Sequence, residues 1–160
     1  MEAITQILIL ASPGHYRDSL VALLRTIPYT EFTFLDSSSY ETESLCRADP
    51  STREISSIIL VDMDSVLAMP PLGKGVISSL TRFKSSWFKA RMIVMVDNLQ
   101  HTREAQRVGA DVILPRGISA GEFLRIVQDL ITRQRRLTKL QPTVSLPSFV
   151  NLQRSGSPSR

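Results

Sequence analysis

The stretch Ile58-Ile59-Leu60-Val61-Asp62-Met63-Asp64 decides the fold of this chain. Four apolar residues, three of them β-branched, run directly into a pair of carboxylates that stand two positions apart. A continuous apolar run predicts a strand buried on both faces, which is typical of a parallel sheet covered by helices. In open α/β sheets, ligands bind at the carboxyl ends of the strands. We therefore expect Asp62 to lie at the edge of the sheet where a functional site forms.

The rest of the chain alternates strand-like and helix-like patterns on both sides of this stretch. Apolar periodicity predicts strands at 4–10, 31–35, 58–62, 92–96 and 111–114, and helices at 16–27, 38–48, 76–84, 101–108 and 120–137. We interpret the segment 63–75, which contains two prolines and two glycines, as an irregular connection. Strands and helices in alternation predict parallel strands joined by right-handed crossovers. The expected fold class is α/β: a flavodoxin-like, three-layer, doubly wound, five-stranded parallel sheet with strand order 2-1-3-4-5.

Composition indicates one globular domain, residues 1–137, followed by a basic Pro/Ser-rich tail, residues 138–160. The net charge of +4 is unevenly spread, because residues 130–160 hold six Lys or Arg and no Asp or Glu. The single cysteine, Cys46, excludes an internal disulfide and is typical of a reducing compartment. No apolar run approaches the roughly 20 residues that span a membrane, and the first residues show no secretory signal. We expect a cytoplasmic protein without a membrane span.

The tail leaves two possibilities open. Its three prolines and five serines are typical of a disordered segment. Five large apolar residues could instead pack on this chain or on a neighbouring one: Val144, Leu146, Phe149, Val150 and Leu152. The basic run 133–139 before it is either a solvated helix end or a contact for an acidic partner, nucleic acid or a membrane surface. No DNA-reading module follows, so we expect no sequence-specific DNA binding.

Several motifs of the chain resemble the receiver domain of two-component response regulators over about residues 4–137. The resembling segments are Leu8-Ile9-Leu10 with Arg17 and Leu20, Ile59-Leu60-Val61-Asp62, and Gly109-Ala110-Asp111-Val112-Ile113-Leu114 with Ser119 and Glu122. The most specific of them is Gly109-Ala110-Asp111. The resemblance implies a cytoplasmic signalling domain of a two-component phosphorelay, not an enzyme, with Asp62 at the phosphoacceptor position.

The chain departs from this family at the positions that support phosphorylation. The acidic pair that holds Mg²⁺ in the family corresponds to Ala11 and Ser12, the Thr or Ser after the fourth strand to Val96, and the Lys after the fifth strand to Arg116. Mg²⁺ prefers carboxylate oxygens and waters, and it supplies most of the charge neutralisation in phosphoryl transfer. We therefore predict a degenerate, pseudo-receiver site that binds no cofactor and is not phosphorylated in the usual way.

Two residues near Asp62 leave alternatives open. Arg116 either forms an ion pair with Asp62, filling the place of the metal, or points into solvent from its loop. Asp64 stands where the family offers a backbone carbonyl to the metal, and it is either a solvated or capping residue or an unorthodox metal ligand. His15 and His101 show no spacing that is typical of metal ligands.

We interpret the chain as an atypical receiver-like signalling domain that acts through protein–protein contact. A second copy of the chain is one possible partner, through a face formed by the helix 101–108, the strand 111–114 and the helix 120–137. This face includes Arg103, Arg107, Ile113 and Arg125. One alternative is a working phosphorelay receiver that accepts phosphoryl on Asp62 with Mg²⁺. Another is a flavodoxin-like binder of a small molecule or anion at Ser12–Gly14, where a helix begins.

Overall fold

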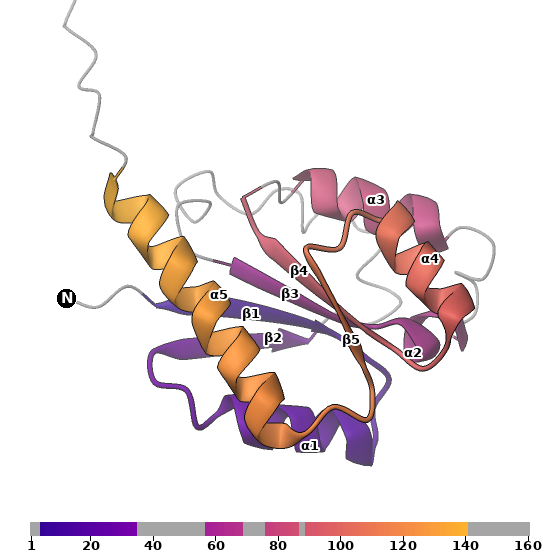
Figure 1. The fold of residues 1–160 in the computed structure, drawn as a ribbon, viewed down its shortest axis with the longest axis horizontal. Coiled ribbons are helices and arrows are strands. Elements are labelled where there is room, and N and C mark those ends of the chain that lie inside the picture. Colours follow the sequence, from indigo (N-terminus) through magenta and orange to yellow (C-terminus); the bar gives the residue numbers. More distant parts are fainter. Residues whose placement is uncertain (1–3, 35–56, 69–75, 87–88, 141–160) are drawn as a thin grey trace, which may run out of the picture.

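The computed structural model of the chain describes residues 4–34, 57–68, 76–86 and 89–140 (Figure 1). Five strands form one parallel sheet in the order β2-β1-β3-β4-β5. The strands are β1 (Thr5–Leu10), β2 (Thr30–Phe34), β3 (Ser57–Asp62), β4 (Arg91–Val96) and β5 (Val112–Pro115). Both the fold class and the strand order predicted from the sequence are confirmed.

Helices cover both faces of the sheet (Figure 1). They are α1 (His15–Leu24), α2 (Met63–Ala68), α3 (Val76–Ser86), α4 (Leu99–Arg107) and α5 (Ala120–Leu140). One core cluster joins the sheet to α2, α3 and α4, and the other joins it to α1 and α5. The three layers follow from this arrangement, and every residue of β3 is buried because helices lie on both of its faces.

The side chains of the central strands alternate between the two cores. Ile59 and Val61 of β3 pack toward the α3 and α4 layer, whereas Ile58 and Leu60 pack toward α1 and α5. Successive side chains of a strand point to opposite faces, so an unbroken apolar run supplies both cores at once. This is the physical reason why the run before Asp62 predicts the architecture.

The interpretation of 63–75 as an irregular connection was wrong for its first half. Helix α2 begins directly after Asp62, and its residues Met63 and Val66 are buried. The hydroxyl of Ser65 donates a hydrogen bond to the Asp62 carboxylate, which caps the first turn of the helix. The predicted helix 38–48, Cys46 and residues 141–160 of the tail lie outside the described residues.

The ends of other helices also differ from the prediction. Helix α4 begins two residues early, at Leu99, because the side chain of Asn98 accepts a hydrogen bond of 3.0 Å from the N–H of His101. Helix α1 ends at Leu24, although the prediction carried it to Ile27. Helix α5 starts at the predicted residue, with a Ser119 cap 3.3 Å from the Glu122 N–H, and it continues to Leu140.

The Gly109-Ala110-Asp111 motif has a structural explanation. Gly109 follows α4 with a φ of 82°, a left-handed conformation that favours glycine. The Asp111 carboxylate accepts hydrogen bonds from Lys84 Nζ at 2.7 Å, Arg91 Nη1 at 2.8 Å and the Met92 N–H at 2.8 Å. Burial by itself would raise the pKa of Asp111. The three donors lower this pKa by more than burial raises it, so the pKa of Asp111 lies below its usual value. The motif therefore ties β5 to α3 and β4.

The second half of α5 is fastened to the amino-terminal edge of the sheet. The buried amide of Gln134 donates hydrogen bonds to the carbonyls of Ser57 at 3.0 Å and Lys89 at 3.1 Å. The guanidinium of Arg135 donates to the Thr5 hydroxyl at 3.2 Å and to the Tyr29 carbonyl at 3.4 Å. Helix α5 therefore runs the whole depth of the sheet and carries the chain past that edge (Figure 1).

Candidate functional site

The predicted site residues come together at the carboxyl-terminal edge of the sheet. Asp62 ends β3, and its strand partners place it between the ends of β1 and β4. Ala11 and Ser12 directly follow β1, and Val96 ends β4. The N–H of Arg116, one residue beyond β5, donates a hydrogen bond of 3.0 Å to the Val96 carbonyl. The strand order thus assembles the site from four separate segments of the chain.

Asp62 is buried beneath Arg116. Its side chain is 1% exposed, and its Oδ2 lies 3.2 Å from Arg116 Nη2. The same Oδ2 accepts the hydrogen bond from Ser65, while Oδ1 has no hydrogen-bond partner among the described residues. Burial raises the pKa of Asp62, and the Ser65 hydrogen bond and the Arg116 charge offset only part of that rise. The Asp62 carboxylate is therefore held by Arg116 and Ser65 through one oxygen only.

Arg116 contacts two groups of the site, while 30% of its side chain remains exposed. Its guanidinium carbon lies 4.2 Å above the centre of the Tyr16 ring, while Nη2 faces Asp62. A guanidinium can stack on an aromatic face and donate hydrogen bonds in its own plane at the same time, which an ammonium cannot do. Burial and the charge of Asp62 raise the pKa of the Tyr16 phenol. Of the two alternatives for Arg116, the structure shows the ion pair.

Tyr16 is a member of the site that the sequence did not point out. It lies in the first turn of α1, which begins at His15 just after the end of β1. The position of Tyr16 in the sequence could have indicated its place in the site. The first turn of a helix that follows a strand lies over the carboxyl edge of the sheet. The aromatic character alone gave no reason to separate it from the core residues of α1.

Asp64 contacts α4, and its charge is one of the causes that raise the pKa of Asp62. Its Oδ1 pairs with Nδ1 of His101, which is in the first turn of α4. Asn98, the capping residue of α4, also lies near this ring, with its Nδ2 3.3 Å from His101 Nδ1. The Asp64–His101 pair joins the short helix α2 to α4. This contact was not predicted from the sequence.

The groups around Asp62 do not fit a Mg²⁺ ion. Ala11 offers a buried methyl group and Val96 a buried isopropyl group where the metal or the phosphoryl oxygens would need polar atoms. The Asp62 carboxylate is already paired with a guanidinium, and Asp64 is paired with His101. Among the described residues, no three His, Cys, Asp or Glu side chains are grouped as metal ligands. The donor set is that of an ion pair rather than of a metal centre.

The second predicted alternative placed an anion at Ser12–Gly14. Gly14 is the residue that caps α1, with no side-chain hydrogen bond, and Ser12 is partly buried beside the end of β1. No described side chain with a positive charge points to this turn in a hydrogen bond or ion pair.

The arrangement of strands and helices is shared with solved receiver domains. The signal receiver domain of an HD domain-containing protein from Pseudomonas fluorescens is similar with a TM-score of 0.64 at 16% identity, over 88% of this chain and 96% of the other. A CheY-like response regulator from Mesorhizobium loti gives 0.56 at 15% identity, over 79% and 98%. A CheY-like receiver domain from Methanospirillum hungatei gives 0.58 at 14% identity, over 84% and 99%. The chain therefore has the receiver-domain fold of response regulators.

The likeness to these structures lies in the fold and not in the sequence. No protein-family model matches the sequence, and no curated protein matches it. The strand order of this fold explains why the carboxyl ends of β1, β3, β4 and β5 meet near Asp62. None of the described helices is long and apolar enough to cross a membrane.

Proposed function

We propose that the chain is a receiver-like signalling domain that acts by protein–protein contact and is not phosphorylated by the Mg²⁺-dependent mechanism of receivers. The observation that supports this most is the contact between Arg116 Nη2 and Asp62 Oδ2 at 3.2 Å. In a receiver, a metal and a phosphoryl group would meet at this carboxylate. Here a permanent cation of the chain itself occupies the position beside it.

The chemistry of the pair opposes phosphoryl transfer to Asp62. A carboxylate that attacks phosphorus must be free and close to a cation that neutralises the phosphoryl oxygens. Asp62 is buried and bound to Ser65 as well as to Arg116, and the neighbouring carboxylate of Asp64 is itself paired with His101. The same contacts connect α1, α2, β3 and the loop after β5, which favours one fixed arrangement of this edge.

The partner surface that fits this function is the face formed by α4, β5 and α5. Arg103, Arg107 and Arg125 are exposed on it, and Ile113 between them is only partly buried. Exposed arginines and a partly buried apolar residue on one face are typical of a protein-binding surface. We propose that this face contacts a protein partner, which can be a second copy of the chain.

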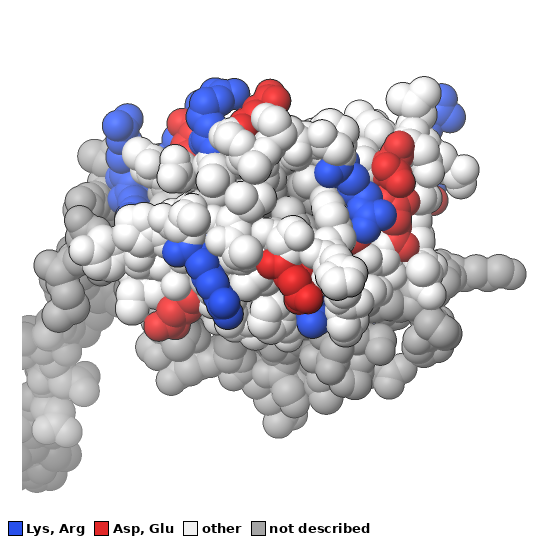
Figure 2. All heavy atoms as spheres, turned by 90° about the horizontal axis from the view of Figure 1, so that it is seen from below, with Lys and Arg blue, Asp and Glu red and all other residues white. Residues whose placement is uncertain are grey.

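The charge pattern supports a protein partner rather than nucleic acid. On the face in Figure 2, Lys and Arg side chains are interspersed with Asp and Glu side chains and form no single large basic patch. Duplex DNA requires a continuous basic surface because most of its affinity comes from phosphate contacts. We therefore assign no DNA binding to the face that Figure 2 shows.

Two experiments test the proposal. Incubation of the protein with acetyl phosphate and Mg²⁺, followed by mass measurement of the intact chain, is expected to show no phosphate adduct. An adduct that disappears in Asp62→Asn would overturn the proposal and establish a working phosphoacceptor. For the partner surface, sedimentation of Arg103→Glu/Arg107→Glu is compared with Ser19→Glu, an exposed control on α1. Loss of a dimer only in the first variant would support pairing through α4.

A further inference from the structure

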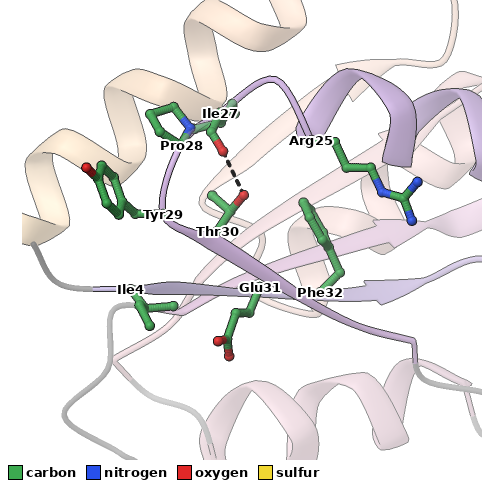
Figure 3. Close-up of a pocket in the computed structure, with 8 residues that line it drawn as sticks. All are labelled: Ile4, Arg25, Ile27, Pro28, Tyr29, Thr30, Glu31 and Phe32. Carbon is green, nitrogen blue, oxygen red and sulfur yellow. Dashed lines mark hydrogen bonds between the residues drawn. The ribbon is translucent and has the colours of Figure 1, made fainter.

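A groove lies at the amino-terminal edge of the sheet, on the opposite side from Asp62. Its volume is about 410 Å³, and its lining comes from Ile4 before β1 and from the turn between α1 and β2 (Figure 3). Two large apolar side chains at this groove are open to solvent: Ile4 is 45% exposed and Tyr29 is 54% exposed. Exposed aromatic and aliphatic side chains gathered at a groove indicate a surface that binds something.

The backbone of Tyr29 is held in an unusual conformation. Its φ of 58° lies in the left-handed region, which a residue with a bulky side chain rarely adopts. The Tyr29 carbonyl accepts hydrogen bonds from the Thr5 N–H at 2.9 Å and from Arg135 at 3.4 Å, and these contacts maintain the conformation. Backbone strain that the surrounding structure enforces is concentrated at functional sites. Here it presents the Tyr29 ring beside the groove.

The neighbouring strand β2 can pair with a further segment. It is the outermost strand of the sheet, so only one of its edges is paired with a described strand, β1. A free strand edge offers a row of N–H and C=O groups that bind an extended peptide, while pockets beside the edge receive alternate side chains of that peptide. Glu31 of β2 and Arg25, which follows α1, also line the groove, so its lining carries one charge of each sign.

The C-terminal tail begins next to this groove. Arg135 of α5 contacts the Tyr29 carbonyl, and α5 ends five residues later at Leu140. These five residues rise about 7.5 Å along the helix. Val144 follows four residues later, within about 14 Å of extended chain. A segment tethered this closely has an effective concentration in the millimolar range, so that even weak contacts hold it.

The tail has a pattern that fits the groove. Its apolar residues Val144, Leu146, Val150 and Leu152 are separated by even numbers of positions, as in a strand that places one face against a surface. Pro147 is tolerated in such a segment because edge strands need not donate every N–H. Residues 141–160 contain Arg154 and Arg160 and no acidic residue, and both arginines lie beyond Leu152.

We propose that residues 144–152 dock in this groove alongside β2, with their apolar side chains against Ile4 and Tyr29. The chain then covers the edge of β2 that no described strand pairs with, together with the exposed ring of Tyr29. The occupant is the tail of the same molecule, because the tether from Arg135 favours it over a second copy.

A spin label placed on the tail of the full-length protein tests this docking. The label is attached to Ser148→Cys in a Cys46→Ser background, and the signals of ¹⁵N-labelled amides are recorded with the label oxidised and reduced. We expect selective broadening at Ile4 and Tyr29–Phe32 but none at Thr81 on α3. The broadening is expected to be lost in Leu146→Asp/Val150→Asp and kept in Ser155→Asp/Ser157→Asp, which adds the same charge outside the segment.

A mixed sample separates the possible occupants. Spin-labelled ¹⁴N protein is added to unlabelled ¹⁵N protein, so only contacts between two molecules broaden the signals. Groove broadening in the mixed sample that equals the broadening within one molecule would overturn docking of the chain on itself in favour of a second copy. Absence of broadening at the groove, or uniform broadening over the protein, would also overturn the proposal. An amide spectrum of each variant that keeps the dispersed signals of the core excludes unfolding as the cause.

Discussion

Arg116 lies over the Tyr16 ring, 4.2 Å from its centre, with Nη2 3.2 Å from the buried Asp62 carboxylate. The stack fixes the plane of the guanidinium, and the carboxylate neutralises its charge. A single arginine therefore connects α1 to the end of β3 from a loop that follows β5.

Arg116→Ala is expected to lower the free energy of unfolding by about 2 kcal/mol at pH 7, because Asp62 then remains buried without its cation. Burial already raises the pKa of Asp62, so the carboxyl is protonated more readily in the folded than in the unfolded chain. The cost of the substitution is therefore expected to shrink as the pH falls through that raised pKa. Urea unfolding at several pH values measures it, and a cost that does not change with pH would contradict the ion pair.

Asp62→Asn removes the titratable carboxylate of the pair and leaves its cation, Arg116, in place. Because the folded-state pKa of Asp62 is raised, the folded chain binds more protons than the unfolded chain between the two pKa values. This residue's contribution to the free energy of unfolding therefore decreases as the pH rises through that window. The Asn variant is expected to lose this decrease, so that its stability falls less between acidic and neutral pH. An unchanged slope in urea unfolding against pH would contradict the raised pKa.

Asp111→Asn is expected to destabilise the fold by about 2 kcal/mol at neutral pH, because charge-assisted hydrogen bonds from Lys84 and Arg91 are weakened. The pKa of Asp111 is lowered in the fold, so its contribution is present above its usual pKa and lost as the pH falls through the folded value. Thermal unfolding against pH measures the loss. Asp129→Asn, in an exposed pair with Arg133 on α5, is the control and is expected to change stability by less than about 0.5 kcal/mol.

Mg²⁺ is expected to leave the melting temperature of the natural chain unchanged, since the groups around Asp62 do not form its ligand set. The variant Ala11→Asp/Ser12→Asp/Val96→Thr/Arg116→Lys restores carboxylates and removes the stacked guanidinium. Its melting temperature is expected to rise with Mg²⁺ concentration, because a ligand that binds only the folded state stabilises it. A similar rise in the natural chain would show that Asp62 binds the metal with other ligands.

Tyr29→Gly and Tyr29→Ala form a matched pair that tests the strained backbone beside the groove. Both remove the ring, but only glycine adopts a φ of 58° without a steric penalty. The glycine variant is expected to be more stable than the alanine variant by about 1 kcal/mol, the reverse of the order in ordinary positions. Chemical denaturation of both variants measures the difference, and a more stable alanine variant would rule out the left-handed conformation.

Much of the architecture could be predicted because it depends on patterns that are local in the sequence. The apolar run that ends at Asp62 predicted a doubly buried strand, and the alternation of strands and helices predicted the order of the sheet. The start of α2 was missed because two prolines further along the segment suggested an irregular connection, while the cap between Ser65 and Asp62 depends on the position of one side chain. The contacts that fasten α5 to the sheet, from Gln134 to Ser57 and Lys89, could not be predicted because these residues are far apart in the chain.

The candidate site, like the fold, could be predicted from the sequence only in part. The sequence by itself determined which residues stand at the ends of the strands, and therefore that Ala11, Ser12 and Val96 offer no carboxylate beside Asp62. It left the direction of Arg116 open, because a loop side chain can turn to solvent or inward with little local preference. Only the tertiary structure decided this, by placing the Tyr16 ring and the buried carboxylate on either side of the guanidinium. Stacking and charge neutralisation act between segments that the chain brings together only when it folds.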